Sequence, residues 1–174
     1  MVEFYGAAPS AEAAIEGFAR ACDVAARHGV LLHLEFLPWA GIPDLASAWE
    51  IVRGADRPNG GLLIDSWHFF RSDSTFAELL EIPGDRILYV QLDDGPNDAE
   101  SDLAEETQHR RLLPGDGAFD LVGLLGALEA IGSVGPIGVE VFSDELVGLP
   151  IDDVAERAGD STRNVLAAAA AGRA

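Results

Sequence analysis

A carboxylate and an imidazole lie three residues apart in the stretch Gly61–Arg71, which reads GLLIDSWHFFR. Asp65 ends a short apolar run, and His68 follows it. Such a run is typical of a buried parallel strand, and barrel enzymes present metal and substrate ligands at the carboxyl ends of such strands. The alternative interpretation is purely structural: Asp65 caps the next turn, and His68 packs against Trp67 or Phe69.

Oxygen-bearing side chains recur near the ends of three other predicted strands. They are Glu35 in VLLHLEF, Gln91 in RILYVQL and Glu140 in PIGVEVF. A buried carboxylate is costly unless it is paired or bound to a metal. Three carboxylates and an amide at one apolar mouth therefore require a cation. Hard oxygen donors favour Mn²⁺ or Mg²⁺ over Zn²⁺ as that cation.

Alternation along one strand indicates how deep each of these groups lies. Leu31, His33 and Glu35 share one face, because successive side chains of a strand point to opposite sides. In a closed barrel this face points inward, with Glu35 near the mouth and His33 one layer below. His33 is therefore expected to support the site or the core rather than to act as a ligand.

The elements that position these groups alternate between strand and helix. The expected strands cover residues 2–6, 30–36, 61–65, 86–92 and 136–142, and the expected helices cover 11–28, 44–54, 75–80, 119–131 and 152–171. This alternation predicts a parallel sheet with right-handed crossovers. No glycine-rich dinucleotide fingerprint follows any of these strands, which argues against a Rossmann domain.

Composition excludes several classes of protein. The net charge is -19, and 11 basic residues are too few to form a face that binds nucleic acid or an anionic membrane surface. All basic residues are arginine, which excludes enzymes that need a lysine amine, such as Schiff-base aldolases, pyridoxal-phosphate enzymes and P-loop NTPases. The single Cys22 and the absence of a signal-peptide or transmembrane pattern favour a cytoplasmic location.

Two segments after the fourth predicted strand leave alternatives open. The acidic segment Asp93–Glu106 is interpreted either as a mobile lid or as a solvated loop. It leads to Arg110 and Arg111, which precede a Pro-Gly-Asp-Gly turn. These guanidinium groups either bind an anionic or polyol substrate or lie in solvent on a surface turn.

Taken together, these motifs resemble the xylose isomerase-like TIM-barrel superfamily, and the resemblance runs from VEFYG to PIGVEVFSDEL. It implies a divalent-metal site formed by four strand-end residues: Glu35, Asp65, Gln91 and Glu140. It also implies that His68, in the Asp-x-x-His motif, and Arg111, ahead of the Pro-Gly turn, bind the substrate.

The resemblance implies metal-assisted proton transfer on a carbohydrate or polyol-like carbonyl compound, as in sugar phosphate isomerases and epimerases. Glu35 and Glu140 would act as the acid and base. Gln91 departs from the histidine usual in isomerases and is more similar to the sugar-isomerase-like domain of bacterial 3-dehydroshikimate dehydratases. A lyase acting on 3-dehydroshikimate or a keto-inositol is therefore an alternative, in which His68 helps a hydroxyl group to leave as water.

The length of the chain limits how much of this fold it supplies. The 174 residues are expected to form a single domain, residues 1–174. A complete barrel has eight strands and about 250 residues, and the five predicted strands correspond to the last five units. We therefore expect an incomplete α/β barrel that is truncated at its N-terminus. Alternatives are an inactive half-barrel that needs a partner chain or an oligomer, and a doubly wound α/β domain.

Overall fold

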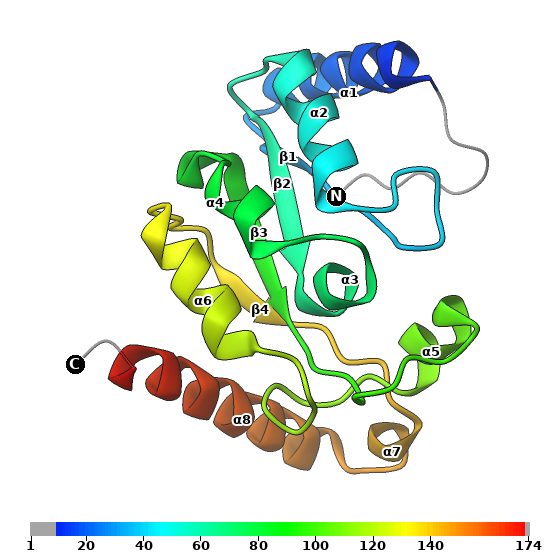
Figure 1. Ribbon diagram of the computed structural model, residues 1–174, viewed down its shortest axis with the longest axis vertical. Helices are drawn as coiled ribbons and strands as arrows, with labels where there is room; N and C mark the ends of the chain where they lie inside the picture. The colour runs from blue at the N-terminus through cyan, green and yellow to red at the C-terminus, as the bar shows by residue number, and fades with distance from the viewer. Residues whose placement is uncertain (1–9, 173–174) are drawn as a thin grey trace.

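The computed structural model describes residues 10–172, so the strand predicted over Val2–Gly6 lies outside the described residues. Four parallel strands form one sheet in the order in which they occur along the chain (Figure 1). They are β1 (Leu32–Leu34), β2 (Gly60–Asp65), β3 (Ile87–Leu92) and β4 (Ile137–Val139). The predicted parallel sheet is confirmed for these four strands.

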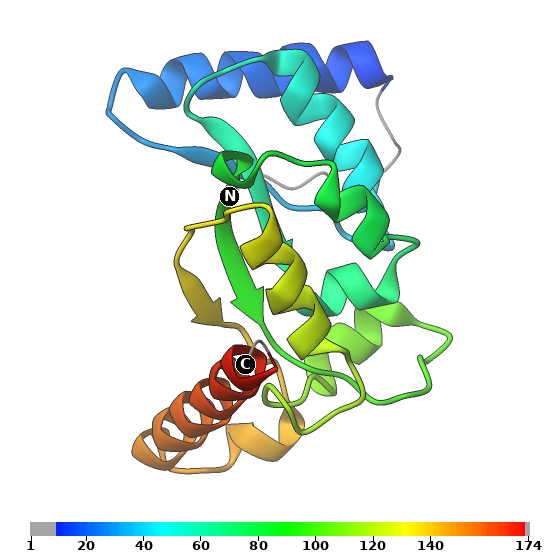
Figure 2. The same ribbon diagram turned by 60° about the vertical axis from the view of Figure 1, so that its left-hand side comes forward.

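Helices connect the strands, and several of them cover one face of the sheet (Figures 1 and 2). They are α1 (Ala11–Ala26), α2 (Leu45–Ala55), α3 (Ser66–Arg71), α4 (Phe76–Leu80), α5 (Leu103–His109), α6 (Leu121–Ala130), α7 (Asp144–Val147) and α8 (Ile151–Ala171), with a 3₁₀ turn η1 (Gly84–Arg86). The hydrophobic core lies between the sheet and α1, α2, α4, α6 and α8. None of the helices within residues 10–172 has both the length and the apolar content needed to cross a membrane.

Local sequence explains where the main helices begin. Ser10 and Asp44 accept hydrogen bonds from backbone amides in the first turns of α1 and α2. Thr75 and Glu78 form a reciprocal capping box at the start of α4. These residues satisfy amide groups that have no partner within the helix. The helix starts predicted at these three positions are confirmed.

The two faces of the sheet carry different chemistry because side chains alternate along each strand. Leu34, Leu62 and Ile64 point into the core. Asp65 and Gln91 lie directly opposite each other in neighbouring strands, on the other face. This second face is the one that lines the interior of a closed barrel, and it carries the predicted site.

Several boundaries differ from the predictions. The strands predicted over 30–36 and 136–142 are three residues long, because the chain leaves the sheet at Glu35 and at Glu140. Three short helices were not predicted: α3, α5 and α7. Each has four to seven residues, too few for a helical hydrophobic pattern to become clear.

The close approach of β2 to β3 requires glycine at position 61. A Cβ atom added to Gly61 would lie 2.5 Å from the carbonyl oxygen of Arg86 and 2.5 Å from Cγ of Leu88. Gly61→Ala is therefore expected to lower the free energy of unfolding by about 1–3 kcal/mol, measured by urea denaturation.

The matched control is Gly126→Ala in α6. A Cβ atom at this exposed helical position meets nothing within 4 Å. Because alanine favours the helix over glycine, this variant is expected to gain about 0.5–1 kcal/mol of stability. Equal effects of the two substitutions would contradict the packing argument.

Candidate functional site

Three buried side chains converge at the carboxyl ends of β1 and β2. Glu35 follows β1, Asp65 ends β2, and His68 lies in the first turn of α3. One ligand atom from each of these residues lies within 4.8 Å of the other two. The exposed fractions of the three residues are 3%, 0% and 2%, so the cluster is shielded from bulk water.

Asp65 has the structural role that its sequence context allowed. It caps α3, and its Oδ1 accepts a hydrogen bond of 2.9 Å from the backbone amide of His68. The His68 ring also packs edge-on against Trp67 and Trp39, with centroid distances of 5.5 and 5.4 Å. The structural interpretation and the functional one are therefore compatible, because the cap and the rings fix the orientation of both ligand groups.

Arg111 reaches into this cluster from the chain segment after α5. Only 2% of it is exposed, so the alternative of a solvated arginine on a surface turn is wrong for this residue. Its Nη1 donates to Oδ2 of Asp65 at 2.8 Å, to Oδ2 of Asp93, and to the carbonyl oxygen of Glu140 at 3.1 Å.

The other guanidinium nitrogens of Arg111 face different neighbours. Nε donates to Oγ1 of Thr107 at 2.8 Å. Nη2 lies 3.4 Å from Nε2 of His68, so one end of the guanidinium group remains directed at the cluster.

Asp93 is a site residue that the sequence analysis did not select. It is fully buried, and its Oδ1 lies 2.5 Å from the hydroxyl group of Ser66, which also accepts a 2.8 Å hydrogen bond from the Asp93 backbone amide. Alternation along β3 places it on the same face as Gln91, but the residue was grouped with the acidic segment after the strand. Its position directly after a predicted strand is the feature of the sequence that could have identified it as a site residue.

The acidic segment is anchored at both ends, where Asp93, Asp94 and Glu106 are buried. Glu106 accepts a hydrogen bond of 2.7 Å from Nε of Arg71, and Nη2 of the same arginine donates to the carbonyl oxygen of Pro96 at 2.6 Å. An ion pair thus ties α5 to α3, whereas the middle of the segment, residues 97–99, is exposed to solvent.

Burial changes the proton affinity of the groups in the site. It lowers the pKa of His68 to about 4, so the imidazole is neutral at pH 7 and has a nitrogen lone pair for a metal. Burial, together with the negative charge of Asp65, raises the pKa of Asp93 well above its usual value. The charge of Arg111 only partly offsets this rise at Asp93, and the same charge adds to the lowering at His68.

Gln91 and Glu140, the other two expected ligands, lie beside the cluster. Gln91 is paired with Asp65 in the register of β2 and β3. Its Oε1 is buried and has no hydrogen-bond partner among the described residues. Oε2 of Glu140 lies 3.7 Å from Nη1 of Arg111. The structure thus places His68, expected to bind substrate, in the cluster, and puts Glu140 at the edge of the same network.

The donor set fits a divalent cation. Two carboxylates, a neutral imidazole and the nearby amide oxygen of Gln91 supply oxygen and nitrogen ligands. Arg111 is shared between Asp65 and Asp93, so a single guanidinium charge faces two buried carboxylates. A cation bound by Glu35, Asp65 and His68 would supply the missing positive charge.

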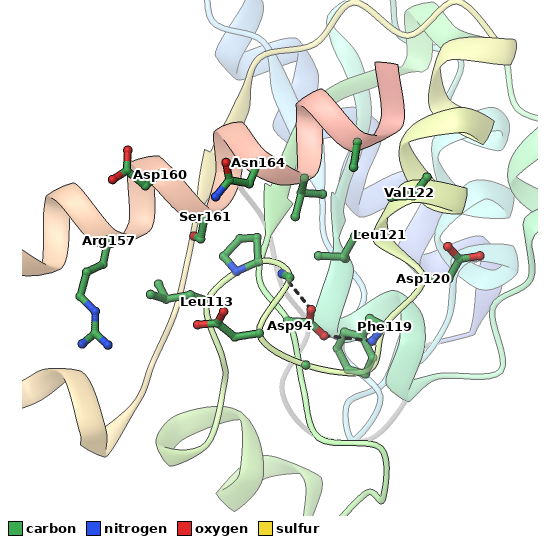
Figure 3. Close-up of a pocket in the computed structure, with 16 residues that line it drawn as sticks. Asp94, Leu113, Phe119, Asp120, Leu121, Val122, Arg157, Asp160, Ser161 and Asn164 are labelled. Carbon is green, nitrogen blue, oxygen red and sulfur yellow. Dashed lines mark hydrogen bonds between the residues drawn. The ribbon is translucent and has the colours of Figure 1, made fainter. Parts of the chain in front are cut away.

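A separate cavity of about 590 Å³ lies between α6, α8 and the turn at 113–117 (Figure 3). Asp94 forms part of its wall and accepts hydrogen bonds from the backbone amides of Gly115 and Phe119, each 3.0 Å long. None of the predicted site residues lines this cavity. Asp94 therefore holds the Pro-Gly turn in place, and the cluster of Glu35, Asp65 and His68 lies outside this cavity.

A sequence profile described as xylose isomerase-like TIM barrel matches residues 4–165. The 3-dehydroshikimate dehydratase of Pseudomonas aeruginosa is 38% identical over 127 residues, which is 72% of this chain and 20% of that protein. The inosose isomerase of Bacillus subtilis is 33% identical over 146 residues, which is 83% of this chain and 51% of that protein.

The solved structure of an IolI protein with a bound zinc atom superimposes with a TM-score of 0.83 at 30% identity. The match covers 89% of this chain and 55% of that one. The chain thus spans between 20% and 55% of the length of these three proteins. The matches confirm the predicted fold class, an α/β TIM barrel with parallel strands, of which residues 10–172 supply four.

Glu106→Gln is expected to destabilise the fold strongly. Glu106 is fully buried, and the substitution leaves the charge of Arg71 without its partner. Removing one member of a buried ion pair costs about 3–5 kcal/mol. Urea denaturation measures this loss, and Asp160→Asn, which breaks the exposed pair with Arg163, should change stability little. If both variants change the free energy of unfolding only slightly, the Arg71–Glu106 ion pair does not anchor α5 to α3.

The chelator-treated protein is expected to lose stability as the pH falls from 7.5 to 5. His68 stays neutral in the folded state down to about pH 4, whereas the unfolded chain binds a proton near pH 6.5. The unfolded state then holds more protons, and His68 contributes a loss of about 2 kcal/mol over this range.

His68→Asn should reduce this loss, measured by urea denaturation at both pH values. His28→Asn is the control, because it removes an imidazole at an exposed position. If His68→Asn loses as much stability between pH 7.5 and 5 as the wild type does, the effect does not come from this imidazole.

Proposed function

The chain belongs to the xylose isomerase-like TIM-barrel family, and from this premise we propose that it is a divalent-metal-dependent isomerase or epimerase of a sugar, sugar phosphate or polyol-like ketone. The observation that carries the proposal is the convergence of Glu35, Asp65 and His68 within 4.8 Å at the carboxyl end of the sheet. Catalytic groups of TIM barrels lie at this end.

The bound ion would supply Lewis-acid polarisation of a substrate carbonyl oxygen, which makes the neighbouring carbon more acidic. Glu35 and Glu140 are the proposed acid and base for the proton of that carbon. Oε1 of Glu35 lies 3.5 Å from Nε2 of His68. The neutral imidazole therefore lies beside the carboxylate that is proposed to move the proton.

Other residues are proposed to bind and orient the substrate. Nη2 of Arg111 faces the cluster beside His68, where the two side chains can hold substrate oxygens. Trp39 and Trp67 enclose the His68 ring and shield it from water. Gln91 and Glu140 complete the proposed ligand set from β3 and from the residue after β4.

The nitrogen donor of His68 widens the choice of metal. The expectation of Mn²⁺ or Mg²⁺ over Zn²⁺ came from a set of oxygen ligands alone. An imidazole in the cluster suits Zn²⁺ as well, and zinc is the metal in the solved IolI structure. Mn²⁺, Mg²⁺ and Zn²⁺ are therefore all candidate metals for the proposed site.

A dehydratase of the 3-dehydroshikimate or keto-inositol type is the second candidate. It is favoured by the 38% identity to the dehydratase of Pseudomonas aeruginosa. The same base would remove the proton next to the carbonyl group, and His68 would protonate the leaving hydroxyl group. The two reactions share their first step, the removal of this proton, and differ only in their second step.

The site is proposed to act within a single barrel domain, of which residues 1–174 supply the later strands. The four described strands do not close a barrel by themselves. Further strands, from a longer chain or a partner chain, would complete the substrate cavity. The three clustered residues come from the segment after β1, from β2 and from α3, all of which the structure describes.

Calorimetric titration of the chelator-treated protein with Zn²⁺, Mn²⁺ and Mg²⁺ is expected to show one binding site. Asp65→Asn should weaken binding at least about a hundredfold, because even residues that only support metal ligands cost 10–100-fold. Asp73→Asn removes the same charge at an exposed position and should bind as the wild type does.

Proton transfer is tested by NMR in D₂O with inosose, ribulose and 3-dehydroshikimate. The expected result is metal-dependent exchange of the proton next to the carbonyl group of one substrate, lost in Asp65→Asn. Accumulation of a dehydrated product would select the lyase. A folded protein that binds no metal would refute the proposal.

A further inference from the structure

We propose that Asp93 is a positioning residue that holds Arg111 away from exclusive pairing with Asp65 and thereby keeps Asp65 available to the metal. The inference rests on the metal site proposed above and assigns a role to a residue outside the ligand cluster. Asp93 contacts the site through Arg111 and Ser66 rather than through the ligands themselves.

The first argument is the geometry of the shared guanidinium group. Nη1 of Arg111 donates to both Asp65 and Asp93, and the carbonyl oxygen of Glu140 is a third acceptor at 3.1 Å. One nitrogen with two protons therefore serves three acceptors. Asp65 therefore shares the Nη1 donor with other acceptors, and its Oδ2 still has a lone pair that can bind a cation.

The second argument is that Asp93 is fixed independently of Arg111. The Ser66 hydroxyl lies 2.5 Å from Oδ1 of Asp93 and 2.8 Å from its carbonyl oxygen. Ser66 directly follows Asp65, so this contact joins the ends of β2 and β3. The carboxylate is thus a fixed counter-charge to which the long arginine side chain is drawn.

The third argument is that Asp65 and Asp93 share one guanidinium group, whereas Arg71, the other arginine of this region, is paired with Glu106. Replacing Asp93 with asparagine removes one of the two carboxylate groups that hold Nη1 of Arg111. Arg111 is then expected to pair with Asp65 one to one and to compete with the metal for it.

The experiment is a double-mutant cycle on the affinity for Zn²⁺ and Mn²⁺, measured by calorimetry on the full chain. Asp93→Asn is expected to weaken metal binding about tenfold. Arg111→Gln removes the competing cation and should bind metal at least as tightly as the wild type. In the Arg111→Gln background, Asp93→Asn should have no further effect.

The control for overall charge is Asp98→Asn, which removes a carboxylate from the exposed part of the same segment and should leave the affinity unchanged. If Asp93→Asn does not fold, Ser66→Ala loosens Asp93 without removing a charge. It is expected to weaken metal binding about threefold, again only while Arg111 is present.

Each outcome has a definite meaning. Equal metal affinity in Asp93→Asn and the wild type would overturn the inference. Equal weakening with and without Arg111 would also overturn it, because Asp93 would then act on the ion directly. No metal binding by the wild type would instead refute the proposed function, so the two failures are distinguishable.

Discussion

The Arg111 guanidinium group, held between two buried carboxylates, is the interaction on which the carboxyl end of the sheet depends. Asp65 ends β2, Asp93 follows β3, and Arg111 comes from the segment before the Pro-Gly turn. Without this cation, two carboxylates would share an interior that excludes water, which is strongly unfavourable. The guanidinium group thus joins three parts of the chain that are distant in sequence.

A second arginine, whose side chain is 7% exposed, supports this arrangement. Arg71 pairs with Glu106 and thereby fixes α5, whose Thr107 accepts the hydrogen bond from Nε of Arg111. The chain contains no lysine, and in this region planar guanidinium groups offer several directed donors from one side chain. Two arginines therefore organise a buried polar layer whose remaining charge deficit matches a divalent ion.

The four described strands, the capped helices and the strand-end carboxylates Glu35 and Asp65 could be predicted from the sequence. These features follow from local patterns: apolar runs, capping residues and the polar group that ends a run. Sequence reasoning did not foresee α5 or the burial of Glu106, because seven mostly polar residues give no local sign that a distant arginine will pair with them. It likewise left Arg111 between two interpretations, since its partners lie 18 and 46 residues away.

The strands differ greatly in how well they are protected, and this has a consequence for motion. Every residue of β2 is buried, whereas Ile137 and Val139 of β4 are 40% and 38% exposed. Segments with little buried apolar contact open at a small fraction of the free energy of global unfolding. Asp65 therefore sits on the strand that is best shielded from water, and Glu140 follows a strand whose apolar side chains are more exposed. Local opening is expected to reach the Glu140 side of the site more often than the Asp65 side.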